Sequence, residues 1–188
     1  MFQAIVTLIA AAAAALGLAL NAHVHSERWS VRTLADGFRP SASPTRTTIA
    51  AERARPAPVI TESTRRQPGE RELLQLTGEL VSVREEFDHD LHLVLRDPKS
   101  GGTLVAEIPY PDPSLPTDLQ ATYRAARRVI ERLVGEAGFA GRAARPGIVL
   151  EVVGIGFFDD PHAIPPEGTA PNAREIHPVL SLRVLATE

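Results

Sequence analysis

The chain is 188 residues long, 44% of its residues are hydrophobic, and its formal net charge is −3 at pH 7. This length suffices for one hydrophobic core rather than two, and the absence of cysteine excludes a disulfide framework, a cysteine zinc site and a thiol nucleophile. Because residues 69–188 hold nineteen acidic against twelve basic residues, this part is a poor candidate for nucleic-acid binding, which depends on Lys and Arg contacts to phosphates.

The first 22 residues predict an export signal or a membrane anchor. They carry no charged side chain, and the apolar run from Ile5 to Leu20 is interrupted only by Thr7 and Gly17. Such a run lacks the polar face of a helix in a soluble domain and is typical of a signal peptide. We therefore expect a periplasmic, cell-surface or secreted protein, or one anchored with its folded part outside and touching the membrane only through this segment.

Residues 23–68 are expected to form a tether rather than a domain. The stretch is rich in Pro, Arg, Ser and Thr, and its prolines interrupt any regular pattern, so most of it should be extended or disordered. Part of it can dock on the folded domain. Trp29 and Val31 alternate with Ser30 and Arg32, and the single Trp of the chain is better placed against an apolar surface than in water.

Residues 69–188 predict a small β domain with one helix. Apolar patterns and turn signals indicate five strands. The strands are expected at Leu74–Val83 with a bend at Gly78, Leu91–Arg96, Thr103–Ile108, Ile148–Phe158 and Pro178–Ala186. Between the third and fourth strands, a helix is expected to begin at Thr117 or Asp118, either of which can cap it. Its apolar stripe ends near Gly135 or Gly138.

This order of elements predicts the fold class: mainly β, a five-stranded OB-fold-like Greek-key barrel with one helix between strands three and four. In such barrels the loops after strands one and four flank the ligand-binding face. Gly154 and Gly156 superficially fit a dinucleotide-binding loop, but the third glycine is missing and no helix follows. They favour curvature in a barrel strand instead.

Four of the six histidines lie in two acidic patches that fall in these two loops or at their edges. The first patch contains Asp88, His89, Asp90 and His92, and the second contains Asp159, Asp160, His162, Glu175 and His177. We expect them to meet at one rim of the barrel. The candidate ligand-binding residues are Asp88, Asp90, His92, Asp159, His162, Asn172, Glu175 and His177.

A divalent metal ion is the cofactor that this pattern suggests. Asp90 with His92, and Glu175 with His177, are pairs of residues two apart on strands, so each pair points to one side. Nitrogen and oxygen ligands together suit zinc, manganese or iron. The alternative stays open that these side chains stabilise loops, with Asn172 fixing a turn. No serine lies in a recognisable nucleophile motif, so catalytic residues stay unassigned.

The segment from Gly154 to Val179 resembles a group of uncharacterised exported bacterial proteins. These proteins share a segment in which GxGFFD is followed by a histidine, then by APN and then by ExHPV. They also share an Asp-x-Asp-x-His-Leu stretch, which is matched here by residues 88–93. The resemblance covers about the last 120 residues, and it implies export but no established activity.

A weaker resemblance at the level of the fold extends to staphylococcal-nuclease-like OB barrels. In these, an acidic hairpin, a strand that ends in a Pro-rich acidic segment, and a helix follow in the same order. Asp88, Asp90 and Glu107 match the carboxylates that such nucleases need for a metal ion, but the third strand contains no Arg. The fold is therefore expected without the reaction.

Taken together, these patterns favour an extracytoplasmic OB-fold-like binding or accessory domain for an unknown ligand or an envelope partner. One alternative is a metal-dependent hydrolase, acting as a phosphodiesterase or nuclease. Another is a structural envelope protein whose motif keeps a long loop folded. Whether the chain is an enzyme stays open, with the balance toward a role without catalysis.

Overall fold

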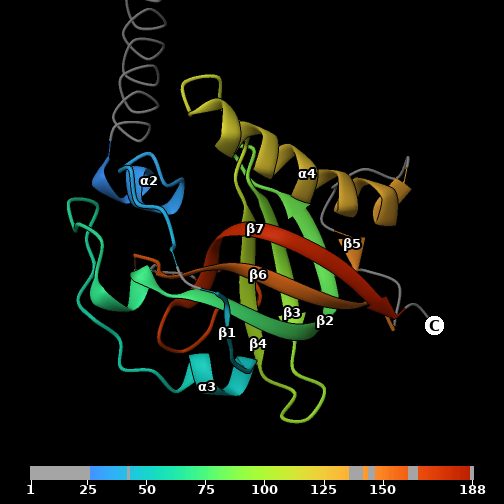
Figure 1. Cartoon of the computed structure of the whole chain (residues 1–188). Helices are drawn as coiled ribbons and strands as arrows, with labels where there is room; N and C mark the ends of the chain where they lie inside the picture. Colours follow the sequence, from blue (N-terminus) through green and yellow to red (C-terminus); the bar gives the residue numbers. More distant parts are fainter. Residues whose placement is uncertain (1–25, 42, 136–141, 144–146, 161–164, 187–188) are drawn as a thin grey trace, which may run out of the picture.

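The structure, a computed structural model, describes residues 26–41, 43–135, 142–143, 147–160 and 165–186 (Figure 1). The predicted export signal or anchor, residues 1–22, and His162 lie outside the described residues. Within the described part of the chain, none of the helices combines the length and the apolar character needed to cross a membrane.

Five strands close into a barrel (Figure 1). They are β2 (Leu73–Glu85), β3 (Leu91–Arg96), β4 (Thr103–Ile108), β6 (Val149–Phe158) and β7 (Arg174–Ala186). Their order is β2-β3-β4-β7-β6, and the pairing of β2 with β6 closes the barrel. The contact between β4 and β7 is parallel, whereas the other neighbours in the barrel are antiparallel. The predicted OB-fold-like barrel is confirmed, with a helix between its third and fourth strands.

Strand β3 is buried on both faces. Leu91, Leu93 and Leu95 belong to the central hydrophobic core, and the alternation of side chains along a strand places His92 and Val94 on the outer side. These two outer residues are also buried, because the loop between β6 and β7 covers them. A Cβ atom at Gly168 of that loop would lie 2.6 Å from a methyl group of Val94. The outer face of β3 is thus the floor beneath this loop.

The helix α4 (Thr117–Val134) begins and ends close to the predicted positions. Leu119, Tyr123 and Ile130 from its apolar stripe are buried. The expected N-cap is wrong, since Pro116 occupies that position without a side-chain bond. Proline suits the first position inside a helix, where its missing N–H is no loss. At the N-cap it has no side-chain oxygen to accept a backbone N–H, so Pro116 does not stabilise this end of the helix. At the other end, Gly135 terminates the helix with a φ of 61°, which favours glycine.

The last strand begins earlier than predicted. β7 starts at Arg174 rather than at Pro178. Pro178 lies inside the strand, at a place where the register between β6 and β7 shifts. Gly154 is paired with Val179 and Gly156 with Ile176, so the ladder is irregular between them. A proline is tolerated at such a bulge, since its missing N–H interrupts no regular ladder bond. The predicted role of the two glycines in strand curvature agrees with this irregularity.

Residues 26–71, apart from residue 42, pack on the barrel, and we call them the docked segment. It contains α2 (Glu27–Arg32), β1 (Thr45–Arg46), α3 (Ile49–Arg53) and the 3-10 helix η1 (Pro68–Arg71). Ser26 and Thr48 cap the two short α-helices through side-chain oxygens. The sequence predicts mostly extended or disordered chain here, and the structure differs because several apolar residues of the segment are buried. Ile49 joins the central core, and Leu34 packs with Leu119 and Ile155. Those buried residues are Val31, Leu34, Ile49 and Ile60.

Two buried arginines fasten the docked segment to the barrel. Arg28 forms an ion pair of 2.6 Å with Glu70 inside the docked segment. It reaches the barrel by donating to the carbonyl oxygen of Phe158 and by stacking over the ring of Phe157. From the barrel side, Arg174 donates to Glu52 of α3 at 2.9 Å. Gly156 makes room for this second guanidinium group, because a Cβ at position 156 would collide with it. Buried charges of this kind require their partners, so the segment and the barrel are held in one relative position.

Candidate functional site

Three polar side chains form a row across neighbouring strands on the outer side of the barrel. His92 of β3 is paired with Glu107 of β4, and β7 runs alongside β4 with Ala106 beside Ile176, which brings His177 next to Glu107. Glu107 Oε1 lies 2.8 Å from His92 Nδ1, and Glu107 Oε2 lies 3.1 Å from His177 Nδ1. One carboxylate therefore contacts two imidazole rings.

His92 is bonded through both of its nitrogens. Nε2 lies 2.9 Å from the backbone carbonyl oxygen of Glu167, which can only accept, so this nitrogen donates. Nδ1 faces the carboxylate of Glu107. Burial lowers the pKa of His92, but the hydrogen bond with Glu107 and its negative charge outweigh burial, and the pKa is raised above its ordinary value.

His177 is 1% exposed and has carboxylates on both sides. Nδ1 lies 3.4 Å from Glu175 Oε1, and Nε2 lies 3.4 Å from Asp90 Oδ2. Among the described residues, neither His177 Nε2 nor Asp90 Oδ2 has a hydrogen-bond partner of good geometry. Burial lowers the pKa of His177, yet Asp90, Glu107 and Glu175 together raise it well above its ordinary value. An unsatisfied buried polar atom costs about 1–3 kcal/mol.

The carboxylates of this cluster have very different acidities. Burial raises the pKa of Asp90, although His177 acts in the opposite direction. Burial and the charges of Glu107 and Asp159 raise the pKa of Glu175 to about 8. Burial also opposes ionisation of Glu107, but its contacts with His177 and His92 hold its pKa far below the ordinary range. The cluster therefore concentrates its negative charge on Glu107.

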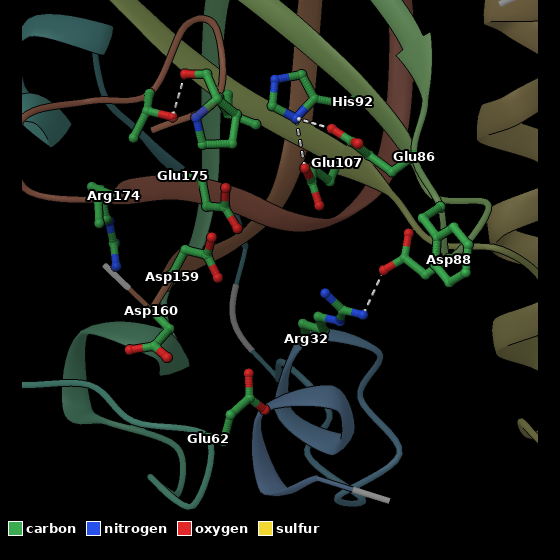
Figure 2. Close-up of a pocket in the computed structure, with 15 residues that line it drawn as sticks. Arg32, Glu62, Glu86, Asp88, His92, Glu107, Asp159, Asp160, Arg174 and Glu175 are labelled. Carbon is green, nitrogen blue, oxygen red and sulfur yellow. Dashed lines mark hydrogen bonds and ion pairs between the residues drawn. The ribbon is translucent and has the colours of Figure 1, made fainter. Parts of the chain in front are cut away.

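A cleft of about 400 Å³ opens over His92 and Glu107 of this row. Figure 2 shows both side chains in the cleft. Its walls come from the loop after β2, the loop after β6 and the docked segment. The acidic residues that line it are Glu62, Glu86, Asp88, Glu107, Asp159, Asp160 and Glu175. The basic and imidazole side chains are Arg32, Arg174 and His92. Seven carboxylates against three such groups make the cleft unfavourable for an anionic ligand.

Arg32 reaches this cleft from α2 (Figure 2). Its Nη2 lies 2.6 Å from Asp88 Oδ2. Burial lowers the pKa of Arg32, but the charges of Asp90 and Asp88 outweigh it and the pKa is raised. At the rim beside Asp88, the ring of Phe87 is 80% exposed. The docked segment thus supplies a cation to a cleft that the barrel makes acidic.

The structure brings together most of the predicted site residues. Asp88, His92, Asp159 and Glu175 line the cleft, and Asp90 and His177 are in contact with each other behind Glu107. Asn172 lies elsewhere. Its side-chain amide donates to the carbonyl oxygens of Glu52 and Arg55, at 2.9 and 3.0 Å, and so holds the docked segment.

Several residues of the cleft are missing from the sequence-based prediction of the site. Glu107 was named from the sequence only as a match to the carboxylates of nuclease-like barrels. Its contact with His92 could have been found, because a hairpin turn at Pro98–Gly102 pairs Arg96 with Thr103 and, by counting back, His92 with Glu107. Arg32 carried no such signal, since the irregular chain around it predicts no fixed position. The position of Arg174 at the cleft could not be predicted, because the last strand was expected to begin after it, at Pro178.

Two sets of three side chains bring possible metal ligands within 4.8 Å of one another. One set is Glu86, His92 and Glu107, and the other is Asp90, Glu107 and His177. In the first set, both nitrogens of His92 are hydrogen-bonded, and Glu86 is paired with Arg84 at 2.6 Å. In the second set, Asp90 and His177 each keep one buried atom without a hydrogen bond.

No family model and no curated protein matches this chain. Among solved structures, it is similar to asparaginyl-tRNA synthetase from Entamoeba histolytica, with 14% identity, a TM-score of 0.45 and coverage of 79% of this chain and 25% of that one. The same enzyme in complex with asparaginyl-adenylate gives 15% identity, a TM-score of 0.43 and coverage of 79% and 25%.

An aspartyl-tRNA synthetase from Leishmania major Friedlin gives 13% identity, a TM-score of 0.43 and coverage of 80% of this chain and 23% of that one. The chain thus spans about a quarter of the length of these enzymes. Such distant similarity carries no argument about function. The strand order of the chain shows that it is an OB-fold-like barrel. The cleft on the outer face of this barrel is lined mostly by acidic residues.

Proposed function

We propose that this protein is an extracytoplasmic binding domain whose acidic cleft takes a cationic ligand. The observation that carries the proposal is the lining of the cleft, in which seven carboxyl groups outnumber two guanidinium groups and one imidazole. With its pKa of about 8, Glu175 is mostly protonated at neutral pH, and the other six still outnumber the cationic groups. Charge of one sign in a partly enclosed cleft attracts ligands of the opposite sign and excludes like charge.

The position of the cleft supports a binding role. It lies on the outer side of β3 and β4, between the loops after the first and fourth barrel strands. This is the face that OB-folds use for their ligands. The cleft also accommodates one cation of the protein itself, the guanidinium group of Arg32 beside Asp88. A cationic group is therefore compatible with its shape as well as with its charge.

The location outside the cytoplasm is supported by the uncharged N-terminal run and by the resemblance to exported bacterial proteins. A fusion of the full chain to alkaline phosphatase at its C-terminus tests this location, because that enzyme is active only after export. Activity that persists without residues 1–22 would contradict an export role for them.

Titration calorimetry of the full chain against a panel of ligands tests the binding role. The panel consists of spermidine, arginine amide, Zn²⁺ and Mn²⁺, with sulfate and a neutral disaccharide for comparison. We expect at least one cation to bind and neither comparison ligand to do so. The double variant Asp159→Asn/Asp160→Asn should weaken cation binding about fivefold or more, because both side chains line the cleft.

The matched control is Asp118→Asn/Glu131→Gln, which removes two negative charges from α4, outside the cleft. This control should bind the cation as the original chain does. Binding of sulfate or the disaccharide in place of any cation would overturn the proposal, as would an equal loss of affinity in both double variants.

A further inference from the structure

Two buried atoms in the cluster behind the cleft lack hydrogen-bond partners within the described chain. They are His177 Nε2 and Asp90 Oδ2, which form an ion pair at 3.4 Å without the geometry of a hydrogen bond. The two residues are 1% and 5% exposed. Buried polar atoms in folded proteins almost always have a partner, so two that face each other point to a ligand between them.

Their separation is that of two ligands on one metal ion. Two donor atoms bonded at about 2.1 Å with a tetrahedral angle between them lie about 3.4 Å apart. Glu107 adds a third donor, since one atom each of Asp90, Glu107 and His177 lies within 4.8 Å of the others. Glu107 also lines the cleft, so the set is next to the solvent-accessible space.

Each of the two facing side chains is held by its second polar atom. Asp90 Oδ1 accepts the backbone N–H of Tyr110 at 2.7 Å. His177 Nδ1 lies 3.1 Å from Glu107 Oε2 and 3.4 Å from Glu175 Oε1. The ring packs edge-on against Phe157 with centroids 5.4 Å apart. Metal-binding histidines and carboxylates are oriented in this way, with the other nitrogen or oxygen bonded to a neighbouring group.

We propose that Asp90, Glu107 and His177 bind a divalent transition-metal ion of the zinc class. The proposal rests on the cationic ligand proposed above and names its chemistry. One imidazole nitrogen and two carboxylate oxygens suit Zn²⁺, Mn²⁺, Fe²⁺ or Co²⁺, whereas Ca²⁺ and Mg²⁺ prefer oxygen ligands alone. Three protein ligands leave a coordination position for water or for a group that enters through the cleft.

The alternative set, Glu86 with His92 and Glu107, is a weaker candidate because its donors are already engaged. His92 is bonded to Glu107 and to the Glu167 carbonyl, at 2.8 and 2.9 Å. Glu86 is paired with Arg84. An ion in either set would have to displace contacts of Glu107 with His92 and His177, at 2.8 and 3.1 Å. Only the set with Asp90 and His177 contains buried atoms without a hydrogen bond.

Equilibrium dialysis of the chelator-treated full chain, followed by elemental analysis, tests the site. We expect one equivalent of Zn²⁺ or Co²⁺, no retained Ca²⁺ or Mg²⁺, and visible Co²⁺ absorption bands typical of a four-coordinate ion. Asp90→Asn keeps the size of the side chain and should lower the metal affinity about 100-fold or more. His177→Ala should do the same. Circular dichroism of both variants without metal establishes that they are folded.

Two variants serve as controls. His89→Ala removes a histidine of the same loop whose side chain is 64% exposed, and it should leave metal binding unchanged. Glu86→Gln should also bind metal normally. If Glu86→Gln abolishes binding and folded Asp90→Asn does not, the ion occupies the alternative set and this assignment is wrong.

The outcomes separate this inference from the proposed function. If no transition metal binds but spermidine or arginine amide does, the metal site is overturned and the cationic cleft stands. If neither the metals nor the organic cations bind, both proposals fail. Stoichiometric metal binding that is lost in folded Asp90→Asn supports both.

Discussion

Arg32 brings a guanidinium group from α2 into a cleft whose charged lining is mostly carboxylate. It lies 2.6 Å from Asp88, and its side chain is 15% exposed. A cation that enters the cleft therefore meets a positive charge that the fold already supplies. The net attraction for a ligand is smaller than the number of carboxylates alone suggests.

Replacing Arg32 with Ala should strengthen cation binding about two- to fivefold, because the loss of a partly exposed ion pair changes free energies by up to about 1 kcal/mol. Titration calorimetry with the tightest-binding cation of the panel measures the change. Arg65→Ala is the matched control, since it removes the same charge from the docked segment at a side chain that is 86% exposed and outside the cleft. Weaker binding by Arg32→Ala would mean that Arg32 supports the cleft instead of competing with its ligand.

At the scale of single elements, the hairpin of β3 and β4 determines which side chains of the cleft are neighbours. Its turn fixes the register that pairs His92 with Glu107. Asp97 holds this turn, since its carboxylate accepts from the Lys99 N–H and from the Ser100 hydroxyl, both at 2.9 Å. The position of one turn residue thus determines a contact in the site.

Asp97→Ala should lower the free energy of unfolding by about 1 kcal/mol at neutral pH, through loss of these bonds. The Lys99 N–H and the Ser100 hydroxyl lower the pKa of Asp97 from 3.8 in the folded state. The charge of Asp97 therefore contributes to the free energy of unfolding at pH values above 3.8. This contribution is lost as the pH falls through the lower pKa of the folded state. Urea unfolding at neutral pH and at about pH 2 measures both effects.

Asp97→Asn is the control for this prediction, because its side-chain oxygen still accepts a hydrogen bond but no longer titrates. It should retain part of the stability and lose the extra pH dependence. An Asp97→Ala effect of the same size at both pH values would show that the charge of Asp97 contributes nothing.

At the scale of the whole molecule, the packing of the docked segment predicts which of its arginines trypsin reaches first. Arg28 has a side chain that is 5% exposed and is paired with Glu70, whereas that of Arg65 is 86% exposed. Brief trypsin treatment should therefore cut after Arg65 well before Arg28, as mass spectrometry of the first fragments would reveal. In denaturant both bonds should be cut at similar rates. Equally early cutting after Arg28 in the native chain would mean that α2 leaves the barrel readily.

The barrel was predictable from local patterns, and so was the docking of Trp29 and Val31, of which Val31 is buried and Trp29 packs against a buried apolar cluster. The docking of the remaining segment was not. Alternating apolar residues such as Leu91, Leu93 and Leu95 indicate strands wherever they occur, and the order of strands and helix then limits the fold. The loop positions of Asp88 and Asp159 followed from that fold. By contrast, Arg28 and Ile49 lie in proline-rich chain without periodicity, and only their complementary surfaces on the barrel fix them. The division of the chain into leader, tether and barrel stays a prediction.

The docking of residues 26–71 also limits how far the barrel can move from the end of the N-terminal run. A free tether of residues 23–68 would reach about 150 Å when extended. Because α2 begins at Glu27 and is capped by Ser26, only the three residues 23–25 lie between residue 22 and the folded part, and residue 22 can lie at most about 14 Å from Ser26. If residues 1–22 remain in a membrane, the acidic cleft is held close to the lipid headgroups, where cations accumulate at an anionic surface.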